Sequence, residues 1–99
     1  MSDSWINISD RVYIVTGGSS GIGNAIVTEL LNNGSTVYNA DLKEGELKNA
    51  KLHFVETDVT DEKAVNALVD QVVAEQGHID GLVNNAGINL PRLLADADE

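Results

Sequence analysis

Cysteine is absent from this 99-residue sequence, proline occurs once, and only six residues are basic. The absence of cysteine excludes a disulfide, a thiolate nucleophile and a cysteine-based zinc site, and it is compatible with a reducing compartment. No apolar run approaches the roughly 18 residues that a membrane span needs, and the N-terminal residues lack the basic and apolar regions of a secretion signal. We therefore expect a soluble, cytoplasmic protein with no membrane partner.

Acidic residues dominate the charged ones. Sixteen acidic residues against six basic residues give a formal net charge of −10 at pH 7. This excess repels nucleic-acid phosphates and anionic lipid headgroups. The two histidines, His53 and His78, have no second metal-ligating residue nearby at a suitable spacing. We therefore expect no nucleic-acid partner and no metal site.

The length of the chain favours one compact domain over residues 1–99, because 99 residues lie at the low end of the usual domain range. The sequence contains no internal repeat, low-complexity tract or proline-rich linker, and its only proline is Pro91. No domain boundary is therefore expected within the chain.

Short apolar segments alternate with amphipathic ones along the chain. β-Branched and aromatic residues predict strands at 11–16, 36–40, 52–56 and 79–85. Apolar residues at three- and four-residue steps predict one helix from Ile22 to the glycine at position 34, and another that starts within 57–62 and ends at Gly77. Strands separated by such helices imply right-handed crossovers in a parallel sheet. The pattern predicts a doubly wound α/β fold.

The segment TGGSSGIG at residues 16–23 follows the first predicted strand and opens the first predicted helix. Backbone N–H groups at a helix N-terminus carry roughly half a positive charge and can hold a phosphate. We assign Gly17 to the tight turn, Gly21 to the approach of a pyrophosphate, and Gly23 to close packing of the helix on the strand. Ser19 and Ser20 can add hydroxyl donors. The alternative is an ordinary strand-to-helix turn, whereas a triphosphate-binding loop is disfavoured because no lysine follows the last glycine.

Asp41 lies eighteen residues after Gly23, at the end of the second predicted strand. A dinucleotide site has an acidic residue at about this offset, where its carboxylate accepts hydrogen bonds from the adenosine ribose. The same carboxylate would repel a 2′-phosphate. No arginine adjoins the loop or Asp41, so we expect NAD rather than NADP, although Lys43 leaves some use of NADP open. The alternative for Asp41 is a solvated loop carboxylate.

Three motifs in this order resemble those of the short-chain dehydrogenase/reductase family. TGGSSGIG is similar to the family's TGxxxGIG loop, the pair Asp58 and Val59 resembles its adenine-side motif, and NNAG at 84–87 resembles the motif that closes its fourth strand. The likeness runs from about residue 8 to about residue 94. It implies that the chain is the N-terminal part, strands one to four, of a Rossmann-type domain that is incomplete at its C-terminus.

The resemblance also implies which residues bind the cofactor, NAD. They are Gly17, Ser19, Ile22 and Gly23 at the pyrophosphate, Asp41 at the adenosine ribose, Asp58 and Val59 at the adenine, and Asn85, Ala86 and Gly87 toward the second ribose. Ser20, Gly21 and Leu42 are further expected cofactor-binding residues.

The family's catalytic residues are not matched in this sequence. The family uses a Tyr-x-x-x-Lys pair with a preceding serine and a helix-borne asparagine. Tyr13 and Tyr38, the only tyrosines, are followed four residues later by Gly17 and Leu42 rather than by lysine. Both tyrosines fall in predicted strands, where a core role is expected. No catalytic residue is therefore assigned.

By this resemblance the whole protein is an NAD-dependent oxidoreductase and a homo-oligomer, which moves hydride between the nicotinamide and a small secondary alcohol or ketone. The segment NLPRLL at 89–94 is similar to that of members acting on sugar phosphates and aldonates, of the sorbitol-6-phosphate dehydrogenase type, which implies a polyol or sugar phosphate and a role in carbohydrate metabolism. Two alternatives remain: a non-catalytic nucleotide-binding module, and a structural or interaction domain.

Overall fold

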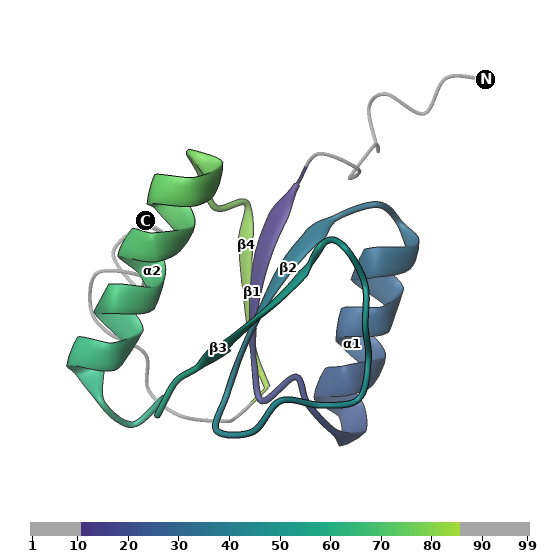
Figure 1. Cartoon of the computed structure of the whole chain (residues 1–99), viewed down its shortest axis with the longest axis horizontal. Helices are drawn as coiled ribbons and strands as arrows, with labels where there is room; N and C mark the ends of the chain where they lie inside the picture. Colours follow the sequence, from purple (N-terminus) through teal and green to yellow (C-terminus); the bar gives the residue numbers. More distant parts are fainter. Residues whose placement is uncertain (1–10, 86–99) are drawn as a thin grey trace.

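A parallel sheet with one helix on each face forms the described part of the computed structural model, residues 11–85 (Figure 1). The elements in chain order are β1 (Val12–Thr16), α1 (Gly21–Asn32), β2 (Thr36–Asp41), β3 (Leu52–Glu56), α2 (Glu62–Gln76) and β4 (Gly81–Asn84). All six predicted elements are present, and the boundaries differ from the predicted ones by a few residues at most. The single domain over residues 1–99 stays a prediction, because it extends beyond the described residues.

The strands lie in the order β3-β2-β1-β4, and every neighbouring pair is parallel. The chain therefore moves outward from β1 through β2 to β3, and α2 then carries it back across the sheet to β4 on the other side of β1. The winding reverses between β1 and β4. The carboxyl ends of the strands and the starts of both helices lie together at the lower edge in Figure 1, the edge where open α/β sheets bind their ligands.

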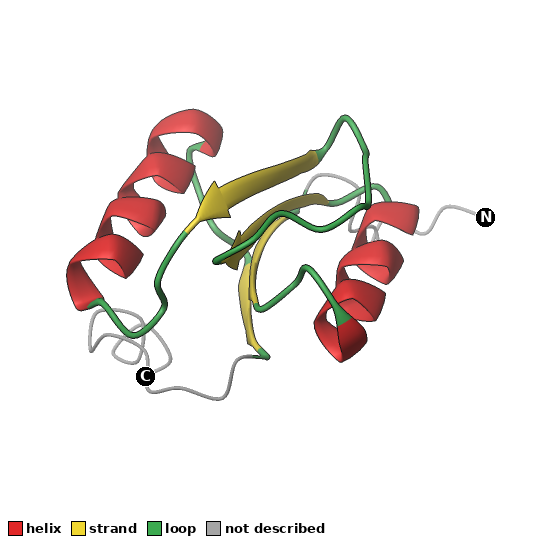
Figure 2. Cartoon of the chain, turned by 60° about the horizontal axis from the view of Figure 1, so that its bottom comes forward, coloured by secondary structure: helices red, strands yellow, loops and turns green. Residues whose placement is uncertain are grey.

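Two hydrophobic cores lie on opposite faces of the sheet, between the helices seen at either side in Figure 2. Alternating side chains of a strand point to opposite faces, so one strand serves both cores. The α2-side core contains Val12, Ile14, Tyr38, Ala40, Leu68, Val69 and Val72, and the α1-side core contains Val15, Val27, Leu31 and Val37. A sheet covered on both faces confirms the predicted doubly wound α/β fold.

Helix α2 shows how local sequence defines an element. Its first amides are capped because the Asp61 carboxylate accepts a hydrogen bond from Lys63 N at 3.0 Å. It ends at Gly77, whose φ of 87° is in the left-handed region. The apolar stripe expected on this helix is buried at Val65 and its partners, but Val73 is 45% exposed because it lies at the flank of the stripe.

Candidate cofactor site

The glycine-rich loop between β1 and α1 makes its turns at two glycines. Gly17 has a φ of 68° and Gly21 a φ of 61°, both in the left-handed region that L residues with a side chain rarely adopt. Gly17 N also donates to Ala40 O at 2.9 Å, which extends the pairing of β1 with β2 by one residue. The loop therefore leaves the sheet in a sharp turn at the carboxyl end of β1.

Gly23 is where α1 comes closest to this loop. A Cβ atom at this position would lie 2.0 Å from Gly17 O, a backbone atom, and 2.7 Å from the Asn85 amide nitrogen. No side chain fits there without moving the loop. At Gly21, by contrast, a Cβ atom would meet no described protein atom within 4 Å, so the space above this residue is open. Gly23 thus allows α1 to pack closely against the loop, whereas Gly21 faces open space.

The first turn of α1 has no side-chain cap for its amides. Ser20 occupies the N-cap position but makes no side-chain capping bond, and the first turn contains no acidic residue. The orphan amides of a helix start are normally satisfied by side chains, water or ligands. Their partial positive charge favours an anion. Gly21, Ile22 and Gly23 provide the first amides, and the Ile22 side chain is 74% exposed.

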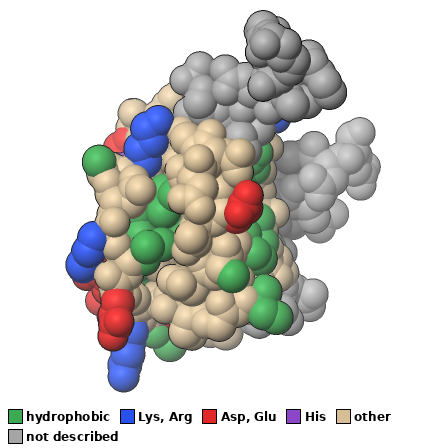
Figure 3. Space-filling model, turned by 90° about the vertical axis from the view of Figure 1, so that its right-hand side faces the viewer, with side chains coloured by type: hydrophobic (Ala, Val, Ile, Leu, Met, Phe, Trp, Pro, Cys, Tyr) green, Lys and Arg blue, Asp and Glu red, His purple; other side chains and the backbone are tan. Residues whose placement is uncertain are grey.

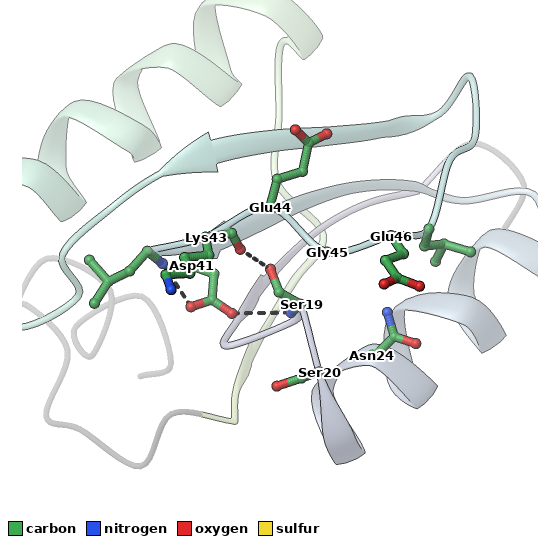
Figure 4. A pocket seen from close by; sticks show the side chains of 10 residues that line it. Ser19, Ser20, Asn24, Asp41, Lys43, Glu44, Gly45 and Glu46 are labelled. Atoms are coloured by element: carbon green, nitrogen blue, oxygen red, sulfur yellow. Dashed lines mark hydrogen bonds between the residues drawn. The ribbon is translucent and has the colours of Figure 1, made fainter.

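Asp41 ends β2 beside this loop and is held by two backbone amides (Figure 4). Its Oδ2 accepts from Ser19 N at 3.1 Å, and its Oδ1 accepts from Leu42 N at 2.7 Å. An ionised carboxylate has about four acceptor positions on its two oxygens. Two of these remain after the amide bonds, enough for the two hydroxyls of a ribose. The side chain is therefore fixed in place and still able to accept.

Ser19 lies beside Asp41 and the segment after β2 rather than at the helix start. Its hydroxyl accepts from Asn39 Nδ2 at 2.9 Å and donates to the carbonyl oxygen of Lys43. Ser20, the next residue, is exposed at the helix start. The two serines of the loop therefore separate: one is tied to β2 and the segment after it, and the other stands beside the open helix terminus.

A pocket of about 830 Å³ lies between the loop, the start of α1 and the segment after β2. Its lining residues are Ser19, Ser20, Asn24, Asp41, Leu42, Lys43, Glu44, Gly45, Glu46 and Leu47. In Figure 4 Glu46 points toward α1, whereas Glu44 points away from it. Three acidic residues and one lysine line the pocket, so its wall carries a net negative charge. Figure 3 shows that charged side chains lie mainly along one edge of the α1 side of the molecule, while its centre is largely uncharged.

The third strand brings Asp58 and Val59 to the same edge of the sheet. Thr57 N donates to Asp41 O at 2.9 Å, which joins the ends of β2 and β3. Asp58 is exposed, and its Oδ1 accepts from Thr60 Oγ1 at 2.6 Å and Thr60 N at 3.0 Å. The bond from the hydroxyl, followed by that from the amide, lowers the pKa of Asp58 from its usual value. Val59 packs against the α2-side core.

Asn85 connects the fourth strand to the glycine-rich loop across the point where the winding reverses. Its Nδ2 donates to Gly17 O at 3.1 Å, and Thr16 Oγ1 at the end of β1 donates to Asn84 Oδ1 at 3.2 Å. The ends of β1 and β4 are therefore held together. Ala86 and Gly87, the other residues expected toward the second ribose, lie outside the described residues.

Two residues of this site were not predicted from the sequence. Asn39 is buried in β2, where its Oδ1 accepts from Gly18 N at 2.9 Å. Gly45 lies in the polar segment after β2, and a Cβ atom there would lie 2.7 Å from Ser19 O. Asn39 could have been noticed as an asparagine in an otherwise apolar strand, since a buried amide must be hydrogen-bonded. Gly45 offered no comparable signal.

Tyr38 does not have the environment of a proton-transferring residue. Tyr38 is buried, and its hydroxyl donates to Glu75 Oε1 at 2.5 Å and accepts from Gln76 Nε2 at 3.1 Å. Burial, followed by the bond to Glu75, raises the pKa of Tyr38, whereas proton exchange near neutral pH needs a lowered one. Tyr13 packs against Gly81. Tyr38 therefore has the expected core role, whereas Tyr13 is only partly buried.

Each histidine contacts another side chain of the described residues. The His53 ring stacks on Tyr38 with centroids 4.6 Å apart, and His78 Nε2 lies 2.9 Å from Asp80 Oδ2. Within residues 11–85 no three histidine, cysteine or acidic side chains are grouped to hold a metal ion. Neither described helix is long and apolar enough to cross a bilayer.

Comparison with known proteins identifies relatives of this chain. A family model described as short chain dehydrogenase matches residues 11–99. Sorbitol-6-phosphate 2-dehydrogenase of Klebsiella pneumoniae is 46% identical over 96 residues, which cover 95% of this chain and 36% of that protein. The solved structure of Thermoplasma acidophilum aldohexose dehydrogenase has 43% identity and a TM-score of 0.71, over 80% of this chain and 30% of that one.

The fold itself is shared more widely. A short chain dehydrogenase from Leptospira borgpetersenii has a TM-score of 0.77 at 22% identity, over 91% of this chain and 36% of that chain. At this identity the likeness concerns the fold alone. The present chain spans about a third of the length of these relatives, so it corresponds to one part of each of them.

Proposed function

The chain belongs to the short-chain dehydrogenase family, and from this premise we propose that it holds the dinucleotide of a longer NAD-dependent oxidoreductase. One observation carries the proposal: an uncapped helix start with an open glycine lies beside a carboxylate that keeps free acceptor positions. The first feature suits a pyrophosphate and the second suits a ribose. A dinucleotide has both groups.

The pyrophosphate would be held by the amides of Gly21, Ile22 and Gly23, with the Ser20 hydroxyl beside them. No first-turn carboxylate opposes an anion there. Gly21 leaves open the space that a side chain would otherwise occupy. The residues present therefore fit a bound phosphate group, by the charge of the helix terminus and by the room above it.

The adenosine ribose would be bound by Asp41, and this favours NAD over NADP. Two unit charges about 4 Å apart interact with about 4 kcal/mol at an effective dielectric of about 20. The partial exposure of Asp41 lowers this figure but not its sign. Glu46 adds negative charge to the pocket wall, and Lys43 offsets part of it. The balance in this pocket disfavours a 2′-phosphate.

The remaining assignments follow the family motifs. Asp58 and Val59 would lie at the adenine, and Asn85 with Ala86 and Gly87 toward the second ribose. Bound nicotinamide would supply the hydride donor or acceptor. We assign the residues of this chain within 11–85 to binding and orienting the dinucleotide.

The substrate class is a polyol, sugar or sugar phosphate with a secondary alcohol or the matching ketone. Support comes from the names of two relatives, sorbitol-6-phosphate 2-dehydrogenase and aldohexose dehydrogenase, both more than 40% identical over the matched region. We further propose that the whole protein is a cytoplasmic homo-oligomer with a small-molecule substrate and no nucleic-acid or membrane partner. Light scattering of the full-length protein measures its oligomeric state.

The test is turnover by the full-length protein that carries this segment. It is supplied with NAD or NADP and a panel of polyols, aldohexoses, sugar phosphates and cyclic ketones, and formation or loss of the reduced nicotinamide is followed. We expect turnover with NAD and at least one polyol or sugar phosphate. Binding of NAD without turnover of any panel member would favour the second candidate, a non-catalytic nucleotide-binding module. Absence of both binding and turnover would contradict both proposals.

A further inference from the structure

Asn39 is a polar residue in the most buried part of the sheet. It lies in β2, two residues before Asp41, and is 3% exposed. Its neighbours Tyr38 and Ala40 belong to the α2-side core, so Asn39 faces α1 and the glycine-rich loop. Burying an amide without hydrogen-bond partners would be costly. Its partners therefore indicate what it does.

Both ends of the Asn39 amide bond to the glycine-rich loop. Oδ1 accepts from Gly18 N at 2.9 Å, and Nδ2 donates to Ser19 Oγ at 2.9 Å. A Cβ atom at Gly18 would lie 2.7 Å from Asn39 Oδ1. The amide thus occupies the space that a side chain at position 18 would need. The fit is mutual: Gly18 makes room for the amide, and the amide satisfies the Gly18 N–H.

Ser19 extends these contacts to the ribose end of the site. Its hydroxyl accepts from Asn39, so its own proton is directed to the carbonyl oxygen of Lys43. Its N–H donates to Asp41 Oδ2 at 3.1 Å. The carbonyl of Ser19 lies against Gly45. One loop residue therefore contacts the carboxylate expected at the ribose and the segment that forms the far wall of the pocket.

We propose that Asn39 is the positioning residue of this cofactor site. By hydrogen-bonding to Gly18 N and the Ser19 hydroxyl, it sets the geometry of the glycine-rich loop and of Asp41 before the ligand binds. The role needs one acceptor and one donor in a single planar group, and among side chains of this size only asparagine offers both. The inference rests on the proposed function, because it concerns how the same site is prepared for NAD.

Replacing Asn39 removes one or both of these functions. Asn39→Asp keeps the acceptor for Gly18 N but loses the donor, so the Ser19 hydroxyl must turn to the new carboxylate and release Lys43 O. Asn39→Leu loses both and leaves the Gly18 N–H buried without a partner. A loop that must be ordered on binding lowers affinity, because ligand binding then includes the cost of ordering it.

The experiment uses the full-length protein and measures Kd for NAD by calorimetry, together with KM for NAD and kcat. We expect Asn39→Asp and Asn39→Leu to raise Kd and KM for NAD by about tenfold to hundredfold, the range for a lost buried hydrogen bond. We expect kcat at saturating NAD to stay within about threefold of wild type, because the loop is ordered once NAD is bound. A purely structural role would not separate KM from kcat in this way.

Tyr38→Phe is the matched control. It changes the adjacent residue of β2 and removes buried side-chain hydrogen bonds, but its side chain faces α2 and makes no hydrogen bond to the loop within the described residues. We expect a lower Tm and an unchanged Kd for NAD. Ser19→Ala, which removes only the hydroxyl, keeps the proposal testable if the Asn39 variants fail to fold, and it should raise Kd for NAD by a few-fold.

Three outcomes separate the two proposals. Wild-type protein that binds no NAD overturns the proposed function. Wild-type protein that binds NAD, with Kd unchanged in a folded Asn39→Asp variant or in Ser19→Ala, overturns the role of Asn39 alone. Raised Kd for NAD in the Asn39 or Ser19 variants, with the Tyr38→Phe value at the wild-type level, supports it.

Discussion

The two helices of the described chain begin in opposite ways. Both N-cap residues have extended backbone angles: Ser20 has a φ of −154° and Asp61 a φ of −100°. Asp61 caps α2 with its carboxylate, and Glu62 adds a negative charge in the first turn. Ser20 leaves α1 without a side-chain cap, and no acidic residue follows in its first turn.

This difference shows how one structural element can serve stability or binding. A capping side chain contributes about 0.5–2 kcal/mol to a helix, and α2 has this contribution. The start of α1 lacks it, because Ser20 makes no side-chain capping bond and glycines occupy the first and third positions of the helix. The carboxylate of Asp41, at the end of β2, bonds to the loop and not to the helix. We interpret α1 as a helix whose first amides are kept for a ligand.

The largest expected effect comes from filling the closest contact at the start of α1. Gly23→Ala places a Cβ atom 2.0 Å from Gly17 O, so the helix or the loop must move. We expect the affinity for NAD to fall by more than about a hundredfold, as the phosphate amides lose their alignment. Calorimetric titration of the full-length protein with NAD measures this.

The equivalent position in α2 provides the control for that substitution. The third residue of α2 is already alanine, Ala64, and Ala64→Gly should cost about 1 kcal/mol of stability through helix propensity alone. Its Kd for NAD should match that of the wild type. Equal effects of the two variants on Kd would contradict the distinction between the helix starts.

The second effect tests whether the carboxylate from β2 selects the cofactor. Asp41→Ser combined with Leu42→Arg removes the repulsion of a 2′-phosphate and adds a partner for it. We expect the preference for NAD over NADP, measured as the ratio of kcat/KM values, to shift toward NADP by about ten- to a thousandfold. The ratio cancels any loosening of the loop, since both cofactors use it. Asp70→Ser, an exposed change of the same charge on α2, should leave the ratio unchanged.

The third effect makes α1 resemble α2. Ser20→Asp gives α1 a capping carboxylate, which should raise stability by about 0.5–1 kcal/mol. The same charge lies where the pyrophosphate is expected, so Kd for NAD should rise by about tenfold or more. Thermal unfolding and NAD titration of one variant would thus move in opposite directions. A variant that is more stable and binds NAD normally would place the anion elsewhere.

The fourth effect is the reciprocal change in α2. Asp61→Ala removes the bond to Lys63 N, and we expect a loss of about 1 kcal/mol in the free energy of unfolding. No change in Kd for NAD is expected, because the capped start of α2 is not part of the proposed NAD site. Chemical denaturation and NAD titration check the two halves of this prediction, and weakened NAD binding would refute the second half.

The smallest effect concerns acid pH at the approach to α2. Asp58 has a pKa lowered from 3.8 by the Thr60 hydroxyl and amide. A lowered folded pKa means that the ionised side chain contributes stability above pH 3.8, and that this contribution is lost as the pH falls through the lower folded value. In Asp58→Asn, Tm should therefore fall slightly less than in the wild type as the pH is lowered through the acid range. The same dependence of Tm on acid pH in both proteins would show that the ionised Asp58 side chain adds no stability.

Local patterns account for the parts of this protein that were predicted correctly. The strand β3 matches its predicted bounds, and α2 shows the expected three- and four-residue apolar spacing, because periodicity depends only on residues close in sequence. The glycine-rich loop lies between β1 and α1 as predicted, because the apolar patterns on either side of it indicate a strand and a helix. The cofactor role of its residues, including Asp41, stays a prediction.

The contacts that shape the site were beyond such patterns. Gly18 and Asn39 are 21 residues apart, and Ser19 and Lys43 are 24 apart. Nothing in either segment alone indicates that the Ser19 hydroxyl turns to the segment after β2, or that Gly45 lies against Ser19. The pairing of β2 beside β1 brings these residues together.

By itself the sequence determined the order of the strands and helices along the chain, the glycines at the turns and the cap of α2, because each depends on near neighbours and backbone preferences. Only the tertiary structure decided the strand order β3-β2-β1-β4, the bonds of Asn39 to the loop and the bonds that hold Asp41. These depend on which faces are buried against each other, which is settled by packing the whole sheet between its two helices.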